Sequence, residues 1–438
     1  MARARRHPPL RVYQNDQLVG HLLKESGGAI EFRYAQEWLD RQGAFPVSLS
    51  LPLREDTWRG EPVVAVFENL LPDSAELRKR VAEKVGAAGY DAYSLLAEIG
   101  RDCIGALQFI AGDAEKLDST AAPTGETVDD EAIERLLNSL AHAPFGLSRD
   151  DDFRISVAGV QEKTALLRLG DQWLKPHGTT PTTHLFKTPI GKLKNGMDLS
   201  HSVENEFYCL RLLQHLGLPV NHARIMTFGR TKALVVERFD RVWDHDRLIR
   251  LPQEDCCQAL SVPPARKYQN EGGPGIVELA NLLKGADSPA DDQRTLFQAQ
   301  LVFWLIGATD GHAKNFSLFL RSGGRYALTP LYDVLSTQPN LDAHEIERKR
   351  MKLAMSVGTQ RHYRIDEVQI RHFFQTGEAA RLSPTLLKRA IEDIAHRMDK
   401  ALAALEADLP ADFPQPLHAS ISQGARQRLR VLQAGLKQ

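Results

Sequence analysis

The residues of this sequence best suited to chemistry form the hexapeptide Asp310-Gly-His-Ala-Lys-Asn315, which is followed by a lone carboxylate at Asp333. The hexapeptide comes directly after an almost purely apolar run, residues 301–308. An aspartate, an asparagine five positions later and then another aspartate is the spacing that phosphotransferases use. In such enzymes the first carboxylate orients the attacking hydroxyl, while the amide and the second carboxylate hold Mg²⁺ on the nucleotide phosphates. The spacing therefore predicts Asp310 as the catalytic residue and Asn315 and Asp333 as Mg²⁺ ligands.

Two further residues of the hexapeptide, His312 and Lys314, can contact phosphates. The two residues before Asp310 are Ala and Thr, whereas ordinary protein kinases carry His-Arg there. An ordinary protein kinase is therefore excluded. A polar turn that caps the preceding helix is the alternative interpretation, but Asp333 in an otherwise apolar strand favours a functional site.

A phosphotransferase also needs a cationic anchor for the phosphates. Lys187 ends an apolar strand, and Glu206 follows it by nineteen residues on the next predicted helix. A glutamate on the helix that follows the lysine's strand can hold the lysine by an ion pair. Glu204 is the weaker choice, because it lies off the helix face that carries Glu206. The alternative is a surface lysine and a solvated glutamate.

The segment from Ser156 to Lys163 is the candidate for a turn whose backbone N–H groups meet the phosphates. Gly159 permits close approach and a positive φ, and Lys163 can add charge. The segment lacks the G-x4-G-K-[ST] pattern of a Walker A loop. An ordinary turn between two strands, with Ser156 making a turn hydrogen bond, is the alternative.

An adenine slot is predicted where residues 235–239 end a strand. Backbone groups there would pair with the base, and Phe239 would help to form the wall of the slot. Apolar residues at a strand end are also common in a simple core, so this prediction depends on the others.

The elements that would position these residues follow from the hydrophobic pattern. Short alternating strands open the chain, with a hairpin turn at Asn15 and Asp16. Ser74 is a good cap for one of the following helices, and the polar residues 113–127 indicate a linker. The predicted strands lie at 10–13, 18–23, 30–34 and 46–53, and the predicted helices at 63–71, 75–85 and 127–140.

From Phe153 onward, strands around glycines and one helix predict a five-stranded antiparallel sheet typical of a kinase-like N-lobe, and the chain becomes mostly helical beyond Leu251. We expect an α+β fold: an N-terminal α/β subdomain (1–145), then a bilobal kinase-like fold with a β-rich N-lobe (146–248) and an all-helical C-lobe (249–438). The strands are expected at 164–169, 172–174, 183–187 and 233–239, and the helices at 202–216, 276–283, 292–308, 365–375 and 384–409.

Composition narrows the class of protein. The 438 residues suffice for two or three domains. The net charge of −1 excludes the overall excess of positive charge that is typical of nucleic-acid-binding proteins. No apolar run is long enough for a membrane span, and the basic first residues lack the apolar segment of a secretory signal. Cysteine spacing fits no metal site and indicates reduced, buried thiols of a cytoplasmic protein. The cysteines are Cys103, Cys209, Cys256 and Cys257.

Over nearly its whole length, the sequence resembles the HipA family, the serine/threonine kinase toxins of bacterial toxin–antitoxin modules. The resemblance implies an N-terminal subdomain on a bilobal kinase of the phosphatidylinositol-kinase type, with ATP and Mg²⁺ between the lobes. The segments that carry it are NLLPDS (69–74), LAEIGRD (96–102), FRISVAGVQEKT (153–164), VERFDR (236–241), LPQED (251–255) and WLIGATDGHAKNF (304–316).

The resemblance also implies roles for single residues. Asp310 matches the family's catalytic aspartate, Lys187 its ATP lysine, and Asn315 and Asp333 its Mg²⁺ ligands. Ser156 matches the serine that the family autophosphorylates to switch itself off, because a phosphate there cannot lie beside the ATP phosphates at low cost. The other implied ATP-binding residues are Val157, Ala158, Gly159, Val160, Gln161, Glu162 and Lys163 of the phosphate loop, Glu237, Arg238 and Phe239 of the adenine hinge, and His312, Lys314 and Tyr332.

Partners are implied as well. The protein target would be glutamyl-tRNA synthetase, whose phosphorylation would stop translation, raise (p)ppGpp and cause dormancy and drug tolerance. A HipB-like helix-turn-helix antitoxin would bind the chain and repress the shared operon with it. Of the basic pair that touches operator DNA in the family, only Arg381 is present, so DNA contact is expected mainly through the antitoxin. Residues 343–351 also depart from the family and predict a mobile, charged loop.

Two other functions stay open at this point. The chain could be chiefly a non-catalytic co-repressor subunit that bridges HipB dimers. It could also be a small-molecule kinase, because related sugar and lipid kinases share the Asp-x4-Asn arrangement. Nothing in the sequence identifies the substrate protein.

Overall fold

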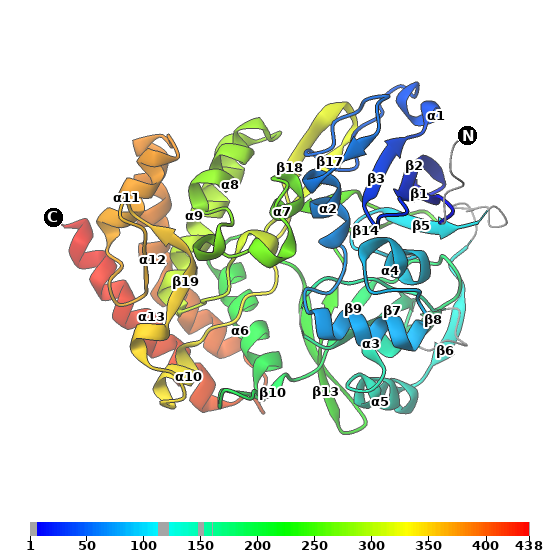
Figure 1. Cartoon of the computed structure of the whole chain (residues 1–438). Helices are drawn as coiled ribbons and strands as arrows, with labels where there is room; N and C mark the ends of the chain where they lie inside the picture. Colours follow the sequence, from blue (N-terminus) through cyan, green and yellow to red (C-terminus); the bar gives the residue numbers. More distant parts are fainter. Residues whose placement is uncertain (1–6, 113–121, 148–152, 160, 438) are drawn as a thin grey trace. The chain divides into compact units, whose positions relative to one another are not determined.

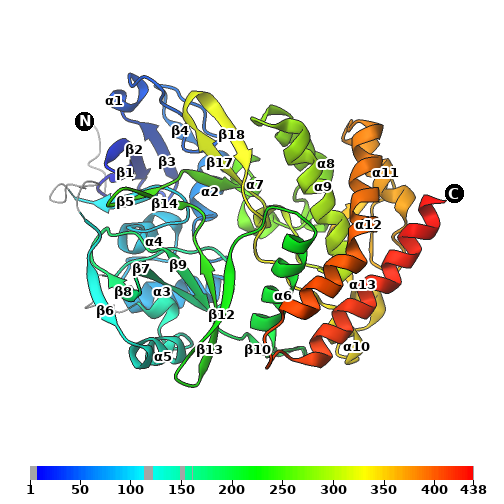
Figure 2. The ribbon, with the colours of Figure 1, turned by 180° about the vertical axis from the view of Figure 1, so that it is seen from behind.

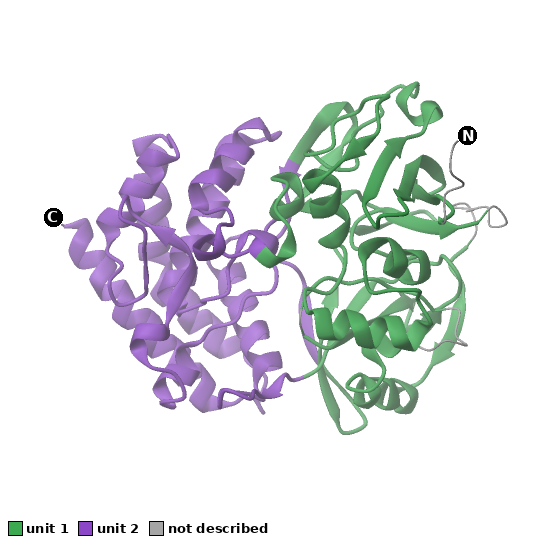
Figure 3. Ribbon diagram, in the orientation of Figure 1, with its two compact units in different colours: residues 1–188, 226–265, 317–326 green, residues 189–225, 266–316, 327–438 purple. Residues whose placement is uncertain are grey.

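The computed structural model describes residues 7–112, 122–147, 153–159 and 161–437. These residues divide into two compact units, coloured separately in Figure 3. They do not coincide with the three predicted domains, whose boundaries stay a prediction. Unit 1 comprises residues 1–188, 226–265 and 317–326, and unit 2 comprises residues 189–225, 266–316 and 327–438.

The first part of unit 1 is a sheet in the order β4-β3-β2-β1-β5, with each neighbouring pair antiparallel. Leu10 and Val12 on its inner face are fully buried, as their alternation predicts. Asn15 makes the predicted hairpin turn at φ 53°, and the Ser74 hydroxyl caps α3 by accepting a bond from the backbone N of Leu77. The elements are β1 (Leu10–Gln14), β2 (Gln17–Lys24), β3 (Ile30–Tyr34), α1 (Gln36–Leu39), β4 (Trp58–Arg59), α2 (Glu61–Glu68), α3 (Ala75–Val85), α4 (Ala92–Ile99) and β5 (Leu107–Ala111).

The prediction of a strand over residues 46–53 is wrong. Val47 and Leu51 are buried, as the alternation requires, but their backbone groups bind a side chain instead of a neighbouring strand. The Tyr34 hydroxyl accepts a hydrogen bond from the Val47 N–H at 3.0 Å and donates one to the Leu51 carbonyl at 2.5 Å. The segment is therefore an irregular loop held by one buried tyrosine.

The second sheet of unit 1 runs in the order β12-β13-β9-β7-β8-β6 and carries one strand more than predicted. The additional edge strand, β6, comes from the end of the predicted linker and pairs with β8; residues 113–121 of that linker lie outside the described residues. Trp173, Phe186 and Phe228 form an aromatic core with Ile133 of α5. The elements are β6 (Gly125–Val128), α5 (Asp130–Ser139), β7 (Lys163–Leu169), β8 (Gln172–Pro176), β9 (His184–Lys187), β12 (Ala223–Phe228) and β13 (Thr231–Glu237).

Short strands complete the β structure around these two sheets. β14 and β15 form a hairpin, and β16, β17 and β18 form a small sheet of their own. Their bounds, with the helix that follows β16, are β14 (Arg241–Asp244), β15 (Arg247–Arg250), β16 (Gln253–Asp255), α7 (Cys256–Ala259), β17 (Ser317–Arg321) and β18 (Arg325–Leu328).

Unit 2 is built around α9, whose residues from Leu296 to Ile306 are all buried. Helices α6, α12 and α13 pack beside it, as both Figure 1 and Figure 2 show. Helix α13 lies beyond the last helix predicted. The elements are β10 (Gly191–Lys192), β11 (Asp198–Leu199), α6 (Ser202–His215), α8 (Ile276–Leu282), α9 (Pro289–Ile306), α10 (Gln338–Asp342), β19 (Lys352–Val357), β20 (His362–Arg364), α11 (Ile370–Ala379), α12 (Pro384–Asp408) and α13 (Gln415–Leu436).

The α+β class is confirmed, but the prediction of an all-helical C-terminal part is wrong. A hairpin of β19 and β20 lies between α10 and α11. The same hairpin explains why α11 begins at Ile370 and not at Ile365. The backbone N of Ile365 donates to the Met351 carbonyl, and its carbonyl accepts the indole N–H of Trp304, so this residue cannot join a helix.

The prediction that the four cysteines are buried thiols is confirmed, because all four are free and buried. Among the helices of the described residues, none is long and apolar enough to cross a membrane.

Candidate phosphoryl-transfer site

Asp310 lies on a turn that follows the C-terminal end of α9. Gly307 ends α9 in the left-handed conformation, and a Cβ there would come within 2.3 Å of Met351 Cε, so the turn requires glycine. The Asp310 carbonyl accepts hydrogen bonds from the His312 backbone N at 2.8 Å and from the Asn315 side-chain N at 2.9 Å. These bonds fix the backbone of the turn, and the Asp310 side chain is exposed.

Asn315 and Asp333 lie together, as predicted for a pair of Mg²⁺ ligands. The Asn315 amide nitrogen contacts the Asp333 carbonyl at 3.4 Å as well as the Asp310 carbonyl. Within the described residues, the Asn315 side-chain oxygen makes no hydrogen bond, so it is the atom available to a cation. Asp333 adopts φ 58°, a conformation that is uncommon for a residue with a Cβ and that concentrates at functional sites.

This donor set fits Mg²⁺. The ion prefers oxygen ligands and is usually held by one or two side chains together with substrate phosphates. The described residues contain no group of three or more His, Cys, Asp or Glu side chains that could hold a metal ion by themselves. A cation that arrives with a nucleotide therefore suits the site better than a resident metal.

The other residues predicted around this turn also come together. The Tyr332 hydroxyl donates a hydrogen bond to the Lys314 carbonyl at 3.0 Å, which ties the segment before Asp333 to the turn that carries Asn315. Lys314 and His312 are 6% and 3% exposed. Asp310, His312, Lys314, Asn315, Tyr332 and Asp333 thus form one cluster in unit 2.

Tyr268 belongs to the same cluster, although the sequence did not point to it. Its hydroxyl donates a hydrogen bond to Oδ1 of Asp310 at 2.5 Å, and its ring meets the His312 ring edge-on at 5.0 Å. The loop is anchored because the Gln269 side-chain oxygen accepts bonds from the N–H and hydroxyl of Ser356. Forty-two residues separate Tyr268 from Asp310, so no local spacing could have joined them.

In unit 1, Lys163 on β7 and Lys187 on β9 lie directly opposite each other in antiparallel register. The two lysines are 5% and 6% exposed. Residues in register extend from the same face of a sheet, and like charges placed opposite each other are destabilising. The pair thus places two positive charges on one face of the sheet, which is the arrangement that a phosphate anchor requires.

The predicted phosphate segment approaches Lys163 closely. Gly159 has φ 107°, and a Cβ there would lie 2.8 Å from the Lys163 ammonium nitrogen, which itself donates a bond to the Ala158 carbonyl at 2.7 Å. Gln161 donates to the Thr188 carbonyl, Glu162 pairs with Arg80 at 3.5 Å, and Val157 is buried. The prediction for Val160 lies outside the described residues.

Ser156 lies fully buried at the start of this segment. Its backbone N donates to the Asp102 carbonyl at 3.0 Å, and its hydroxyl donates to the Leu70 carbonyl at 2.8 Å. In this conformation the hydroxyl cannot accept a phosphoryl group, because it is enclosed and hydrogen-bonded. Modification of Ser156 would require the segment to leave Leu70.

The predicted adenine hinge, Glu237 to Phe239, continues from β13. The Arg238 side chain uses its guanidinium within the protein: it donates to Asp240, Asp102, Thr182 and the Cys103 carbonyl at 2.7 to 3.2 Å. Its backbone N also donates to the Thr183 carbonyl at 2.8 Å, and its carbonyl accepts from the Arg241 backbone N at 3.2 Å, so the contact of Arg238 with a base stays a prediction. The Phe239 ring packs edge-on against Phe319 at 5.7 Å.

Asp102 is the centre of this buried charge network. Burial disfavours its charged form, but Arg241, Arg238 and Arg250 outweigh that effect and hold the pKa of the Asp102 carboxyl below its ordinary value. The arginines lie 2.9 to 3.2 Å from its oxygens. Removing one member of such a network leaves buried charges unpaired, which is strongly destabilising. The network fixes the hinge strand to the segment that also holds Ser156.

Two predictions stay untested by the geometry. Glu206, and Glu204 as its weaker alternative, lie on α6 in unit 2, whereas Lys187 lies in unit 1. Their pairing therefore remains a prediction. Arg381 is exposed after the end of α11, with φ 57°, and its contact with DNA also remains a prediction.

Comparison with known proteins gives one family for most of the chain. Residues 10–110 match the model described as the HipA N-terminal domain, and residues 155–402 match the HipA-like C-terminal domain. The Y4mE protein of Sinorhizobium fredii is 31% identical over 96% of this chain and 98% of its own. The serine/threonine-protein kinase toxin HipA of Shewanella oneidensis is 28% identical over 92% of this chain and 90% of its own.

A solved structure agrees with these relatives. A chain of the Shewanella oneidensis complex of HipA, HipB and operator DNA aligns with a TM-score of 0.81 and 25% identity, over 98% of this chain and 99% of that chain. The resemblance noted in the sequence and the kinase-like α+β fold are thereby confirmed.

Proposed function

This chain belongs to the HipA family, and we propose that it is a toxin kinase that transfers the γ-phosphoryl group of ATP to a serine or threonine of a protein. The observation that carries the proposal is the cluster in unit 2, where the exposed Asp310 carboxylate lies on a turn bonded to Asn315, beside Asp333. Phosphoryl transfer depends mainly on positioning and charge neutralisation, and the cluster offers both.

Each residue has one role in this proposal. Asp310 orients the acceptor hydroxyl and takes its proton. The Asn315 side-chain oxygen and the Asp333 carboxylate hold Mg²⁺, which neutralises charge on the phosphates when bound. Lys163 and Lys187 bind the phosphates from the sheet of unit 1, with Glu206 as the orienting partner of Lys187.

The direct test uses labelled ATP, Mg²⁺ and a whole lysate. The Asp310→Asn variant should lose transfer to protein by about 100-fold or more, because a positioned base commonly contributes that much. Asp399→Asn on α12 is the matched control and should transfer normally. Wild-type transfer by Asp310→Asn would refute the proposal, and label on a metabolite instead of a protein would favour a small-molecule kinase.

Further parts of the proposal concern targets and control. We propose glutamyl-tRNA synthetase as the protein substrate, with growth arrest and drug tolerance as the result, and Ser156 as the autophosphorylation site that ends activity. Phosphoproteomics after brief expression tests both, because it reports the target and the Ser156 state together. We also propose a cytoplasmic location, because the chain would have to meet this target there.

The solved relative supports a second proposed role, which is binding to an antitoxin. The Shewanella oneidensis relative was solved with HipB and operator DNA, so we propose that this chain binds a HipB-like antitoxin and represses its operon with it. Arg381 is exposed and could add a weak DNA contact. A gel-shift assay tests this role. If the antitoxin shifts operator DNA equally with and without this chain, co-repression is contradicted. Toxicity that persists in Asp310→Asn would instead favour a non-catalytic role.

A further inference from the structure

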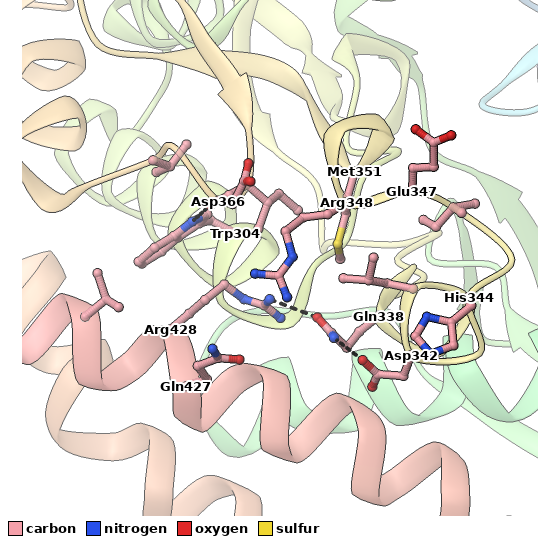
Figure 4. Close-up of a pocket in the computed structure, with 15 residues that line it drawn as sticks. Trp304, Gln338, Asp342, His344, Glu347, Arg348, Met351, Asp366, Gln427 and Arg428 are labelled. Atoms are coloured by element: carbon pink, nitrogen blue, oxygen red, sulfur yellow. Dashed lines mark hydrogen bonds between the residues drawn. The ribbon is translucent and has the colours of Figure 1, made fainter.

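Unit 2 contains a cavity of about 780 Å³ whose lining takes no part in the proposed transfer site (Figure 4). Its volume lies in the range of sites for small organic molecules. Trp304, Met351 and Ile365 give it an apolar wall, and Val431 of α13 lies at its edge with 49% of its surface exposed. One rim is residues 343–351, the charged loop that departs from the family.

Two guanidinium groups meet in this cavity. Arg348 extends from the charged loop and Arg428 from α13, and their side chains face each other in Figure 4. No salt bridge joins either arginine to a carboxylate in the part of the chain that the structure describes. The two positive charges are therefore not neutralised by a salt bridge to a carboxylate of the described residues.

The carboxylates that line the cavity are engaged elsewhere. Asp342 accepts hydrogen bonds from the Gln338 amide at 2.8 Å and from the Ser420 hydroxyl at 2.6 Å. Ion pairs occupy the other two acids: Asp366 with Arg364 at 2.8 Å, and Glu347 with Lys349 at 2.7 Å. The cavity thus combines acids that are bonded to other groups with two arginines that form no salt bridge within the described residues.

Arg428 shows the imbalance most clearly. Its Nε donates to the Leu305 carbonyl at 2.7 Å and its Nη1 to the Gln338 side-chain oxygen at 2.8 Å, and both acceptors are neutral. Its Nη2 is buried and has no hydrogen-bond partner among the described residues. Burial lowers the pKa of Arg428 to about 10, and the charge of Arg348 acts in the same direction against the opposing effect of Asp342. An anion in the cavity would offset this cost.

We propose that this cavity binds a small organic anion, with its carboxylate or phosphate at Arg348 and Arg428 and its apolar body against Trp304 and Ile365. The cavity wall leads to the catalytic turn. Arg428 bonds to the Leu305 carbonyl, and the Thr337 N–H bonds to the Gly307 carbonyl at 2.8 Å. A bound anion therefore acts on the end of α9, from which Asp310 follows.

Calorimetric titration of the full-length chain tests the site, with excess Mg²⁺·ADP present so that the nucleotide site is filled. Decanoate and phenyl phosphate supply the two kinds of anionic head on an apolar body. Decanol supplies the body without the charge, and inorganic phosphate supplies the charge without the body. Saturable binding of decanoate or phenyl phosphate, at least tenfold tighter than that of decanol and of inorganic phosphate, is expected. The two anions distinguish a carboxylate head from a phosphate head.

Variants locate the binding. Arg348→Gln on the exposed loop and Val431→Glu at the rim should each weaken the binding at least tenfold, whereas Arg350→Gln, on the same loop but outside the cavity, should not. Because Arg348 and Val431 are exposed, these variants should fold. Absence of saturable binding by both anions, decanol binding as tightly as decanoate, or binding unaffected by both variants would overturn the proposal. None of these outcomes depends on kinase activity.

Discussion

The hydroxyl of Tyr268 donates a hydrogen bond to Oδ1 of Asp310, with the two oxygens 2.5 Å apart. Within the described residues, Tyr268 provides the one side-chain hydrogen bond to this carboxylate. One carboxylate oxygen is therefore held in place while the other is left for an acceptor hydroxyl. A carboxylate held in this way is oriented before the substrate arrives, which is what a positioned base requires.

Replacing Tyr268 with Phe should lower kcat for protein phosphorylation about tenfold, because a hydrogen bond to a charged group is worth about 1.5–3 kcal/mol. The KM for ATP should stay nearly unchanged, because the Tyr268 hydroxyl bonds to the proposed catalytic carboxylate of Asp310 and not to a proposed metal ligand. Steady-state kinetics at saturating protein substrate separate the two effects.

Tyr363→Phe on β20 is the control for the loss of a phenol in the same unit. An unchanged kcat in Tyr268→Phe would show that the bond does not position the base. A higher kcat would show that the phenol blocks the acceptor position instead.

The lysines that face each other across β7 and β9 should be needed for nucleotide binding. Mg²⁺·ADP should raise the Tm of the wild-type chain, and this shift should be lost in Lys187→Met and reduced in Lys163→Met, because each removes one charge that the phosphates neutralise. Lys175→Met on the neighbouring strand β8 serves as the control and should keep the shift. A full shift in both Lys187→Met and Lys163→Met would place the nucleotide elsewhere.

Ser156 should control the segment that follows it. Ser156→Asp places a charge where the hydroxyl is fully buried against the Leu70 carbonyl, so the segment should be displaced and ADP binding lost. Ser156→Ala should bind ADP normally, and its stability should fall by about 1 kcal/mol for the lost hydrogen bond.

Mass spectrometry after incubation with ATP completes the Ser156 experiment. Wild-type chain should gain one phosphate on Ser156 and lose activity with time, whereas Ser156→Ala should stay active. Equal rates of inactivation in both proteins would remove Ser156 as the control point.

The proposed catalytic cluster was predictable from sequence because its residues are close together in the chain. Asp310, His312, Lys314 and Asn315 lie within six consecutive residues, and the turn that carries them is fixed by their own backbone bonds. Asp333 was found because a lone carboxylate stands in an otherwise apolar segment. The prediction that this segment is a strand is wrong, because Leu331 makes only an isolated bridge with Val220. Tyr268 was missed because its bond to Asp310 depends on the tertiary path of a loop anchored by Ser356.

The fold was predictable where alternation or capping decides it, as in β1 and α3. It was not predictable where a buried side chain replaces a backbone partner. Tyr34 holds residues 46–53 as a loop, and Trp304 holds Ile365 outside α11. Each bond joins residues that are distant in sequence, so periodicity alone gives no sign of it.

Glu254 on β16 gives the stability of unit 1 a pH dependence. The side chain is 1% exposed, and burial raises the pKa of its carboxyl to about 8. One oxygen accepts the Leu49 N–H at 2.9 Å, while the other is buried with no hydrogen-bond partner in the described residues. The folded chain therefore holds a proton between about pH 4.5 and 8 that the unfolded chain releases.

Stability should fall as the pH rises through that window, because the unfolded state binds fewer protons than the folded state there. Glu254→Gln keeps the neutral form at every pH, so at pH 8.5 it should exceed the wild type in stability by an amount on the order of 4–5 kcal/mol. At pH 5.5, one unit above the ordinary pKa of 4.5, the difference should shrink to about 1.4 kcal/mol. Thermal unfolding at pH 5.5, 7.0 and 8.5 measures this, with Glu83→Gln on the exposed side of α3 as the control. A Glu254→Gln curve parallel to the wild-type curve at all three pH values would show that Glu254 is ionised in the folded chain.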